Sequence, residues 1–229
     1  SYRAPHHSST TASVFGGGSH KAKIGEVGLA HRGILFFDEL PHFSKIILEA
    51  LREPLQDNKI RISRVNSKVE YPSDFLFVSA MNPCPCGNLL NAQKECRCSE
   101  LDVYRYKNRL SDPFLERIDL CVVMQQVNPN DKATISSSDM HKQVIEVHKR
   151  VKLRGQKSFT AKLSDAEIDK FCVLSTEAKD ILDMAVHKFA LSFRSIKKIQ
   201  KVARTIADLD ESETIQKPHL LEALSYRRR

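Results

Sequence analysis

The first half of the chain alternates short apolar runs with amphipathic stretches. Ile34–Phe37 has four bulky apolar residues in a row, and Phe75–Ala80 is a second such run. Runs without polar alternation are typical of strands buried on both faces of a parallel sheet. Between the two runs, apolar residues recur at helical spacing from Pro41 to Leu55, and two short alternating segments within 60–71 predict a hairpin.

A third apolar run, Ile118–Val123, follows a basic amphipathic helix that we predict over 100–110. Residues 111–116 are predicted as a short connection between them, and Gly25–Ala30 as a short strand or turn. This alternation of strands and helices predicts an α/β sheet over residues 1–127.

The pattern changes near residue 128, where the strand signals end. Residues 131–157 predict a charged helix, three further helical patterns follow, and Pro218 opens a short terminal helix. The three patterns cover about 164–172, 175–190 and 193–209. The division that we predict is an α/β core over 1–127, a connecting helix over 128–157 and an all-α region over 158–229.

Composition narrows the class of protein only slightly. Of the 229 residues 41% are hydrophobic, enough for a sizeable core, and the net charge is +8 at pH 7. The positive charge favours a polyanionic partner, nucleic acid first, although the basic residues are dispersed. No apolar stretch reaches the ~20 residues that cross a bilayer, and no signal-peptide pattern is present, so we expect a cytoplasmic protein without a membrane partner. Because the chain starts at Ser1 without a Met, we also expect a piece of a longer protein.

Two carboxylates follow the first apolar run directly. Asp38 and Glu39 stand where a parallel strand would end, which is where ligands of open α/β sheets bind. In a nucleotide-hydrolysing enzyme the first acid helps to hold Mg²⁺ and the second polarises the attacking water. The alternative is a core strand that ends in solvated acids near a helix start. Asn82 follows the second run, where its amide would contact the γ-phosphate or the water, or simply belong to an Asn-Pro turn.

Three arginines are candidates for contact with phosphate. Arg117 precedes the third apolar run, where an arginine finger would be offered to a neighbouring subunit, and Arg109 is open to the same interpretation. Arg194 opens a long helix of the C-terminal region, from which it would reach back to phosphate. The alternative for each is an ordinary surface arginine, with Arg117 in a salt bridge to Glu116 or Asp119.

Four of the six cysteines lie close together, as Cys84-Pro85-Cys86 and Cys96-Arg97-Cys98. Four thiolates suffice for a tetrahedral structural zinc site, although one intervening residue is fewer than the usual two or more. A reversible disulfide and a set of inert thiols are the alternatives.

The other cysteines and several histidines have less specific interpretations. Cys121 and Cys172 are expected in the core. His6, His7 and His20 are candidates for binding metal or phosphate, with flexible surface histidines as the alternative.

Six motifs occur in a recognisable order along the chain. They are Tyr2–His7, Gly25–His31, Phe37–Pro41, Ala80–Gly87, Arg117–Asp119 and Val202–Leu209. With them the chain resembles the magnesium-chelatase-like AAA+ ATPases of bacteria, specifically the ComM/YifB branch. The resemblance covers essentially the whole chain, and the motif Ala80–Gly87 is highly specific for that branch.

The resemblance implies an AAA+ P-loop-type parallel sheet followed by a helical lid. It also implies an ATPase that uses ATP and Mg²⁺ and assembles into a homo-oligomeric ring, a hexamer. DNA is the implied partner, because ComM-type proteins act on DNA in natural transformation as branch-migration motors. It does not imply metal insertion into porphyrin.

Site residues are carried over position by position. Asp38 and Glu39 match the Walker B pair, Asn82 matches sensor 1, Arg117 the arginine finger and Arg194 the sensor 2 arginine of the lid. Segment 59–71 would match the hairpin before sensor 1, and residues 13–30 an insertion around the preceding helix.

The sequence departs from the family in one respect. Gly16–Lys21 is the only Gly-rich stretch that ends in Lys, and it lacks the Gly that directly precedes the Lys of a phosphate loop. The family's phosphate loop, its strand and a Lon-protease-like domain would lie upstream, so we expect an incomplete sheet and no useful ATP hydrolysis by this chain alone. The rival functions are a zinc-containing nucleic-acid-binding module without ATPase activity and a chelatase-type ATPase that remodels protein.

Overall fold

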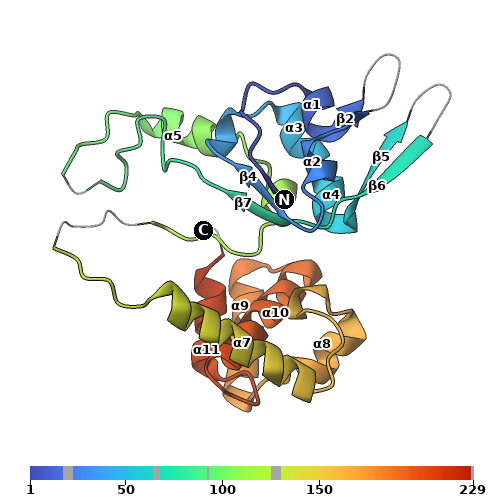
Figure 1. Cartoon of the computed structure of the whole chain (residues 1–229). Coiled ribbons are helices and arrows are strands. Elements are labelled where there is room, and N and C mark those ends of the chain that lie inside the picture. Colours follow the sequence, from blue (N-terminus) through green and yellow to red (C-terminus); the bar gives the residue numbers. More distant parts are fainter. Residues whose placement is uncertain (18–22, 64–67, 92, 125–129, 228–229) are drawn as a thin grey trace. The chain divides into compact units, whose positions relative to one another are not determined.

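The computed structural model divides into two compact units, Ser1–Ile118 and Asp119–Arg229 (Figure 1). It describes residues 1–17, 23–63, 68–91, 93–124 and 130–227. Within these ranges no helix combines the length and apolarity needed to span a membrane.

A three-stranded parallel sheet forms the centre of the first unit. Strand β4 (Ile34–Phe37) lies between β1 (Tyr2–Arg3) and β7 (Leu76–Ser79). The predicted strands at 34–37 and 75–80 are therefore confirmed, and they are neighbours. The two-residue strand β1 was not predicted, because two residues are too few to show a period.

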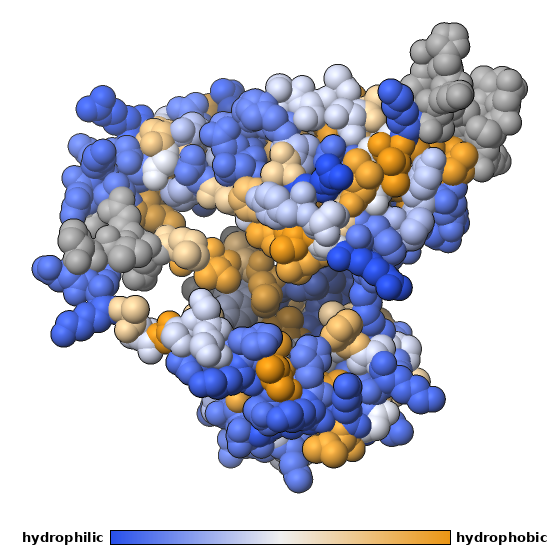
Figure 2. All heavy atoms as spheres, viewed as in Figure 1, coloured by the Kyte–Doolittle hydropathy of each residue, from blue (hydrophilic) through white to orange (hydrophobic). Residues whose placement is uncertain are grey.

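Strand β7 is more exposed than its apolar sequence predicted. It is an outer strand of the sheet, and Leu76 and Val78 on one of its faces are exposed. In the central strand β4, Leu35 and Phe37 are fully buried but Ile34 is exposed, so this strand is buried on one face and not on both as predicted. Figure 2 shows apolar patches of this kind among mostly hydrophilic side chains on the visible faces.

Short helices and two small antiparallel pairs complete the first unit. The helices are α1 (Thr11–Phe15), α2 (Glu26–Leu29), α3 (Lys45–Ala50), α4 (Arg52–Asp57), α5 (Glu100–Lys107) and α6 (Asp112–Leu115), with a 3₁₀ turn η1 (Leu40–His42). The strand pairs are β2 (Gly16–Gly17) with β3 (Lys23–Ile24), and β5 (Lys59–Ser63) with β6 (Lys68–Pro72). The predicted hairpin is thus confirmed, although its tip lies outside the described residues, as does part of the segment 13–30.

Side-chain caps explain where several of these helices begin. The hydroxyl groups of Ser44, Ser99 and Ser111 accept hydrogen bonds from backbone N–H groups at the starts of α3, α5 and α6. The apolar side chains of α3 and of the preceding turn η1 share a core with β4, and the Phe37 and Phe43 rings stack with centroids 4.1 Å apart. This core fixes the end of β4.

Three local predictions were wrong. Gly25–Ala30 contains the helix α2 with its two cap residues, and residues 111–116 contain the helix α6 because Ser111 and Asp112 supply a cap and an acidic first turn. The apolar run Ile118–Val123 is not a strand, since no strand among the described residues pairs with it, and Cys121 within it is exposed rather than in the core.

Among its described residues, the second unit has helices as its regular elements, together with one isolated bridge between Leu174 and Ile215. Its elements are α7 (Ser137–Leu153), η2 (Thr160–Lys162), α8 (Asp165–Phe171), α9 (Thr176–Phe189), α10 (Phe193–Leu209) and α11 (Lys217–Ser225). The three helices predicted between 164 and 209 and the terminal helix are confirmed. Helix α7 packs against α10. Cys172 is buried, as predicted.

A buried ion-pair network joins two residues of α10 to Arg154 at the end of α7. Arg204 and Asp208, one helical turn apart, are both almost wholly buried and joined at 2.8 Å, and Arg154 forms a bidentate pair with the same carboxylate at 2.6 and 2.9 Å. Because a buried charge must be compensated, each member of the network depends on the others.

Candidate functional site

The carboxyl ends of β4 and β7 lie side by side. Their register pairs Phe37 with Ser79. Beyond the strands, the backbone N–H of Ala80 donates to the Phe37 carbonyl at 2.9 Å, and the N–H of Leu40 donates to the Ala80 carbonyl at 3.0 Å. The structure therefore brings Asp38 and Glu39, which follow β4, to the same edge of the sheet as Asn82, which follows β7.

The two acids have different surroundings. The Asp38 carboxylate accepts a hydrogen bond from the Glu39 backbone N–H at 2.9 Å. Glu39 has a left-handed backbone, with φ of 50° and ψ of 46°, which is uncommon for a residue that is not glycine. Its side chain is 46% exposed, with Oε2 lying 3.3 Å from His7 Nδ1 and 3.4 Å from His42 Nδ1. An exposed carboxylate at a strand end is accessible to a ligand.

The histidine contacts to Glu39 were not predicted. His7 comes from the segment after β1, and His42 ends the η1 turn three residues after Glu39. The i,i+3 spacing is the only sequence signal for His42, and it becomes informative only once a helical turn is known to follow Glu39.

Tyr106 is a further residue at this edge that the sequence did not single out. It lies on α5 and is 6% exposed, and the centroid of its ring lies 6.1 Å from that of His42. Burial raises the pKa of its phenol and outweighs the opposite effect of the Asn82 backbone. The ring contact places α5 beside the turn that follows Glu39.

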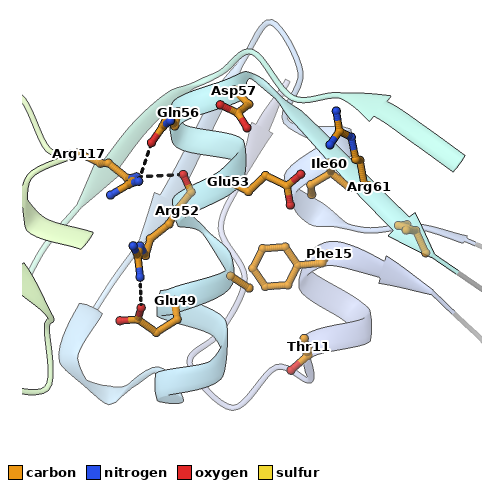
Figure 3. A pocket seen from close by; sticks show the side chains of 12 residues that line it. Thr11, Phe15, Glu49, Arg52, Glu53, Gln56, Asp57, Ile60, Arg61 and Arg117 are labelled. Atoms are coloured by element: carbon orange, nitrogen blue, oxygen red, sulfur yellow. Dashed lines mark hydrogen bonds and ion pairs between the residues drawn. The ribbon is translucent and has the colours of Figure 1, made fainter. Parts of the chain in front are cut away.

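Arg117 lies at a different place, beside a hollow of about 520 Å³ that α1, α3, α4 and β5 line (Figure 3). Its guanidinium donates to the carbonyl oxygens of Arg52 and Pro113 at 3.1 and 2.5 Å, and to Gln56 Oε1 at 2.6 Å. Asp119 instead pairs with Lys198 at 2.7 Å. The structure thus holds Arg117 against α4 and does not bring it to the acidic pair of its own chain.

A carboxylate on α3 stabilises the wall of this hollow. Glu49 accepts a 2.5 Å hydrogen bond from the Ser111 hydroxyl and a 2.7 Å ionic hydrogen bond from Arg52. These two contacts, the Ser111 bond first, lower the pKa of Glu49. Glu49 links the start of α6 to α3 and α4.

Arg109 and Arg194 are both exposed. Arg109 follows α5 in the first unit, and Arg194 is the second residue of α10 in the second unit. Their roles in phosphate contact stay predictions.

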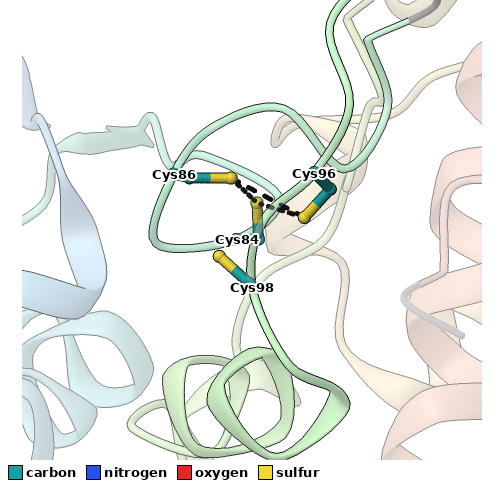
Figure 4. Close-up of side chains that lie close together, drawn as sticks. All are labelled: Cys84, Cys86, Cys96 and Cys98. Carbon is teal, nitrogen blue, oxygen red and sulfur yellow. Dashed lines mark hydrogen bonds between the residues drawn. The ribbon is translucent and has the colours of Figure 1, made fainter.

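The four clustered cysteines converge on one point (Figure 4). The Sγ atoms of Cys84, Cys86 and Cys96 are 3.5–3.7 Å apart, and all four Sγ atoms, including that of Cys98, lie within 4.8 Å of one another. Gly87, with φ of +78°, closes a turn in which its N–H donates to the Cys84 carbonyl at 3.0 Å. This turn lets two cysteines separated by one residue point the same way.

The crowded thiols differ in acidity. Hydrogen bonds from the backbone at Asn88 and Arg97 lower the pKa of Cys86 to about 6. A backbone hydrogen bond at Cys86 acts in the same direction on Cys98, but burial and the neighbouring thiols outweigh it and raise the pKa of Cys98 to about 12. Like charges so close together disfavour four thiolates unless a cation lies among them.

Two protein-family models match the chain, one over each of its halves. The family model for magnesium chelatase, subunit ChlI, matches residues 1–132, and the model for the C-terminal part of that subunit matches residues 134–227.

Curated relatives match over nearly the whole chain. The uncharacterized protein YifB of Salmonella typhimurium is 42% identical over 232 residues, and competence protein ComM of Haemophilus influenzae is 40% identical over 232 residues. The uncharacterized protein Mb2921c of Mycobacterium bovis is 35% identical over 234 residues. The alignments cover 98–99% of this chain but 45% of each relative.

The parallel sheet with its helical second unit is the AAA+ fold with a helical lid. By sequence and by fold, the chain belongs to the magnesium-chelatase-like AAA+ family, in the branch that contains YifB and ComM.

Proposed function

We propose that the protein carrying this chain hydrolyses ATP, with Asp38 helping to hold the Mg²⁺ of the nucleotide and Glu39 activating water. The observation that supports this most is the common edge of β4 and β7, where both acids and Asn82 follow neighbouring parallel strands. Carboxylate and amide oxygens are hard ligands of the kind that Mg²⁺ prefers. Membership of the family implies use of ATP and Mg²⁺.

The three side chains take different roles in this proposal. Asp38 is held by the Glu39 N–H, which leaves its second carboxylate oxygen to help hold Mg²⁺. Glu39, half exposed and contacted by His7, accepts hydrogen bonds from the attacking water. Asn82 orients that water or the γ-phosphate. Mg²⁺, when bound there, would neutralise charge on the phosphates.

Assembly into a ring, a hexamer, follows from the same proposal. An arginine finger acts on the nucleotide of a neighbouring subunit, so Arg117 needs no contact with Asp38 of its own chain. Its three oxygen acceptors on α4, on α6 and at the Gln56 side chain fix the plane of its guanidinium. Arg194 on the helical unit would contact phosphate as the sensor 2 arginine.

DNA is the substrate that we propose for this motor. The net charge of +8 favours a polyanion, and one of the relatives is named a competence protein. The expected work is remodelling or branch migration of DNA, as the resemblance to ComM implies. The zinc ion that we assign to the cysteines is argued separately below.

ATP turnover with and without branched DNA tests the proposal in the full-length protein. We expect turnover that DNA stimulates and that Glu39→Gln lowers by at least about 10²-fold, the usual contribution of a general base. Glu53→Gln removes an exposed carboxylate of the same unit and is the matched control. If Glu39→Gln behaves as Glu53→Gln does, Glu39 has no such role.

The four-thiol cluster favours a second candidate, a nucleic-acid-binding module without ATPase activity. Under that alternative Cys96→Ser abolishes DNA binding and the full-length protein shows no turnover. A third alternative, an ATPase that remodels protein, predicts turnover that DNA does not change. The proposed motor requires both turnover and its stimulation by DNA.

A further inference from the structure

We propose that Cys84, Cys86, Cys96 and Cys98 bind one structural zinc ion, which joins the segment after β7 to the start of α5. By joining them, the ion holds Asn82 at the edge of the sheet. The metal site itself does not rest on the proposed ATPase function, whereas the value of positioning Asn82 does.

The distances between the sulfur atoms fit a single ion. In a tetrahedral site with Zn–S bonds of about 2.3 Å, neighbouring sulfur atoms are ~3.8 Å apart. Cys84, Cys86 and Cys96 show separations of 3.5–3.7 Å, and Cys98 Sγ lies within 4.8 Å of each of these sulfur atoms. A disulfide would bring one pair to about 2.05 Å, so the geometry does not favour that alternative.

The loop that carries the cysteines has little else to hold it. Of its described residues from Pro83 to Cys98, only Cys84 is buried, and none lies in a helix or strand. Leu89 and Leu90 within it are exposed. A loop without an apolar core remains disordered unless a cross-link or a metal offsets its conformational entropy. Four convergent thiols in such a loop are therefore best explained by a metal.

The ligands stand at the two ends of the loop. Only Pro83 separates Asn82 from Cys84, and Cys98 directly precedes Ser99, the N-cap residue of α5. An ion held by both pairs closes the loop and fixes the start of α5 beside the end of β7.

A ring contact brings α5 to the same edge of the sheet. Seven residues beyond the N-cap, the centroid of the Tyr106 ring lies 6.1 Å from that of His42, which in turn contacts Glu39. The four thiols would therefore join the segment that carries Asn82 to a helix that packs beside the acidic pair. Loss of the ion would remove that connection, and we expect Asn82 to lose its fixed position.

Metal analysis tests the site without any nucleotide. We expect one zinc per chain in purified full-length protein, and, after exchange with cobalt, the intense visible bands of tetrahedral cobalt with thiolate ligands. Cys96→Ser should lower the zinc content and remove those bands. Cys121→Ser, which changes an exposed cysteine outside the cluster, should keep both. Iron in place of zinc, no metal, or a disulfide among the four would overturn the proposal.

Hydrogen exchange tests the positioning effect. After removal of zinc by a chelator, the amides of residues 80–91 and of α5 should exchange more than about tenfold faster, because a structural metal contributes directly to local folding. Helix α10 of the other unit is the internal control. Unchanged exchange in metal-free protein would refute the positioning role while leaving both the metal site and the ATPase proposal intact. Zinc present in a protein that lacks turnover would refute only the proposed function.

Discussion

His7 Nδ1 lies 3.3 Å from Oε2 of Glu39, the carboxylate to which we assign activation of water. His42 contacts the same oxygen at 3.4 Å. Two imidazole rings thus restrict the position of one half-exposed carboxylate, whose backbone is already unusual. This arrangement is a property of the folded chain that separate motifs in the sequence do not reveal.

Replacement of His7 should therefore impair catalysis more than binding. We expect His7→Ala to lower kcat of the full-length protein by about tenfold with little change in KM, because a loosened carboxylate loses its alignment with the water. His7→Asn, which keeps a hydrogen-bonding group, should retain more of the rate. A rise in KM alone would place His7 in nucleotide binding instead.

The buried carboxylate of Asp208 should be among the most sensitive positions for stability. Asp208→Asn leaves Arg204 and Arg154 without their shared anion, and we expect a loss of about 3–5 kcal/mol in the free energy of unfolding. Asp169→Asn is the control, because its carboxylate pairs with Lys197 but is 71% exposed. Urea titration followed by circular dichroism would compare them. Equal effects of the two changes would contradict the burial argument.

Phe37 should be equally sensitive in the first unit. Its side chain is fully buried and stacks on Phe43, so Phe37→Ala should cost about 3–5 kcal/mol. Tyr104→Ala in the same unit removes a side chain that is 65% exposed, and should change stability by no more than about 0.5 kcal/mol. Thermal unfolding of both variants measures the difference.

Glu49 should make stability depend on pH in acid. Its pKa is lowered in the folded chain, by the Ser111 hydrogen bond first and then by Arg52, so it binds protons more weakly there than in the unfolded chain. The stabilisation is complete above the unfolded pKa of about 4.3 and is lost as the pH falls through the lower folded value. Glu49→Gln should thus lower Tm at neutral pH, with the gap closing below about pH 4.

The control for this experiment is Glu53→Gln, on the next helix and exposed. Its Tm should follow that of the unchanged protein at every pH. A gap between Glu49→Gln and the unchanged protein that is constant with pH would mean that packing, and not ionisation, is the cause.

Apolar periodicity and capping residues were enough to predict most of the strands and helices. The strands at 34–37 and 75–80, the hairpin and the helices of the second unit each have a local signal, because apolar spacing and capping residues act over a few positions. The prediction of a strand at Ile118–Val123 was wrong because strand formation is not determined by local sequence alone. The composition of this run is that of a strand, but a strand also needs a neighbour to accept its hydrogen bonds, and no local pattern supplies one.

The features of the candidate site also fall into two groups, those with a local sequence signal and those that depend on tertiary packing. The sequence predicted that Asp38, Glu39 and Asn82 follow two apolar strands. The contacts that His7, His42 and Tyr106 make could not be predicted, because they depend on how separate segments pack at the edge of the sheet. The convergence of four thiols also depended on a turn at Gly87 that allows a one-residue spacing.

The left-handed backbone of Glu39 has a consequence for evolution and engineering. Holding a residue other than glycine in this conformation costs on the order of 1 kcal/mol or more, and a glycine would relieve it. Glu39→Gly would then be a trade of activity for stability, gaining free energy of folding while removing the carboxylate. Sequence optimisation that rewards only thermostability would tend to erase this acid, and the position should be held fixed in any such design.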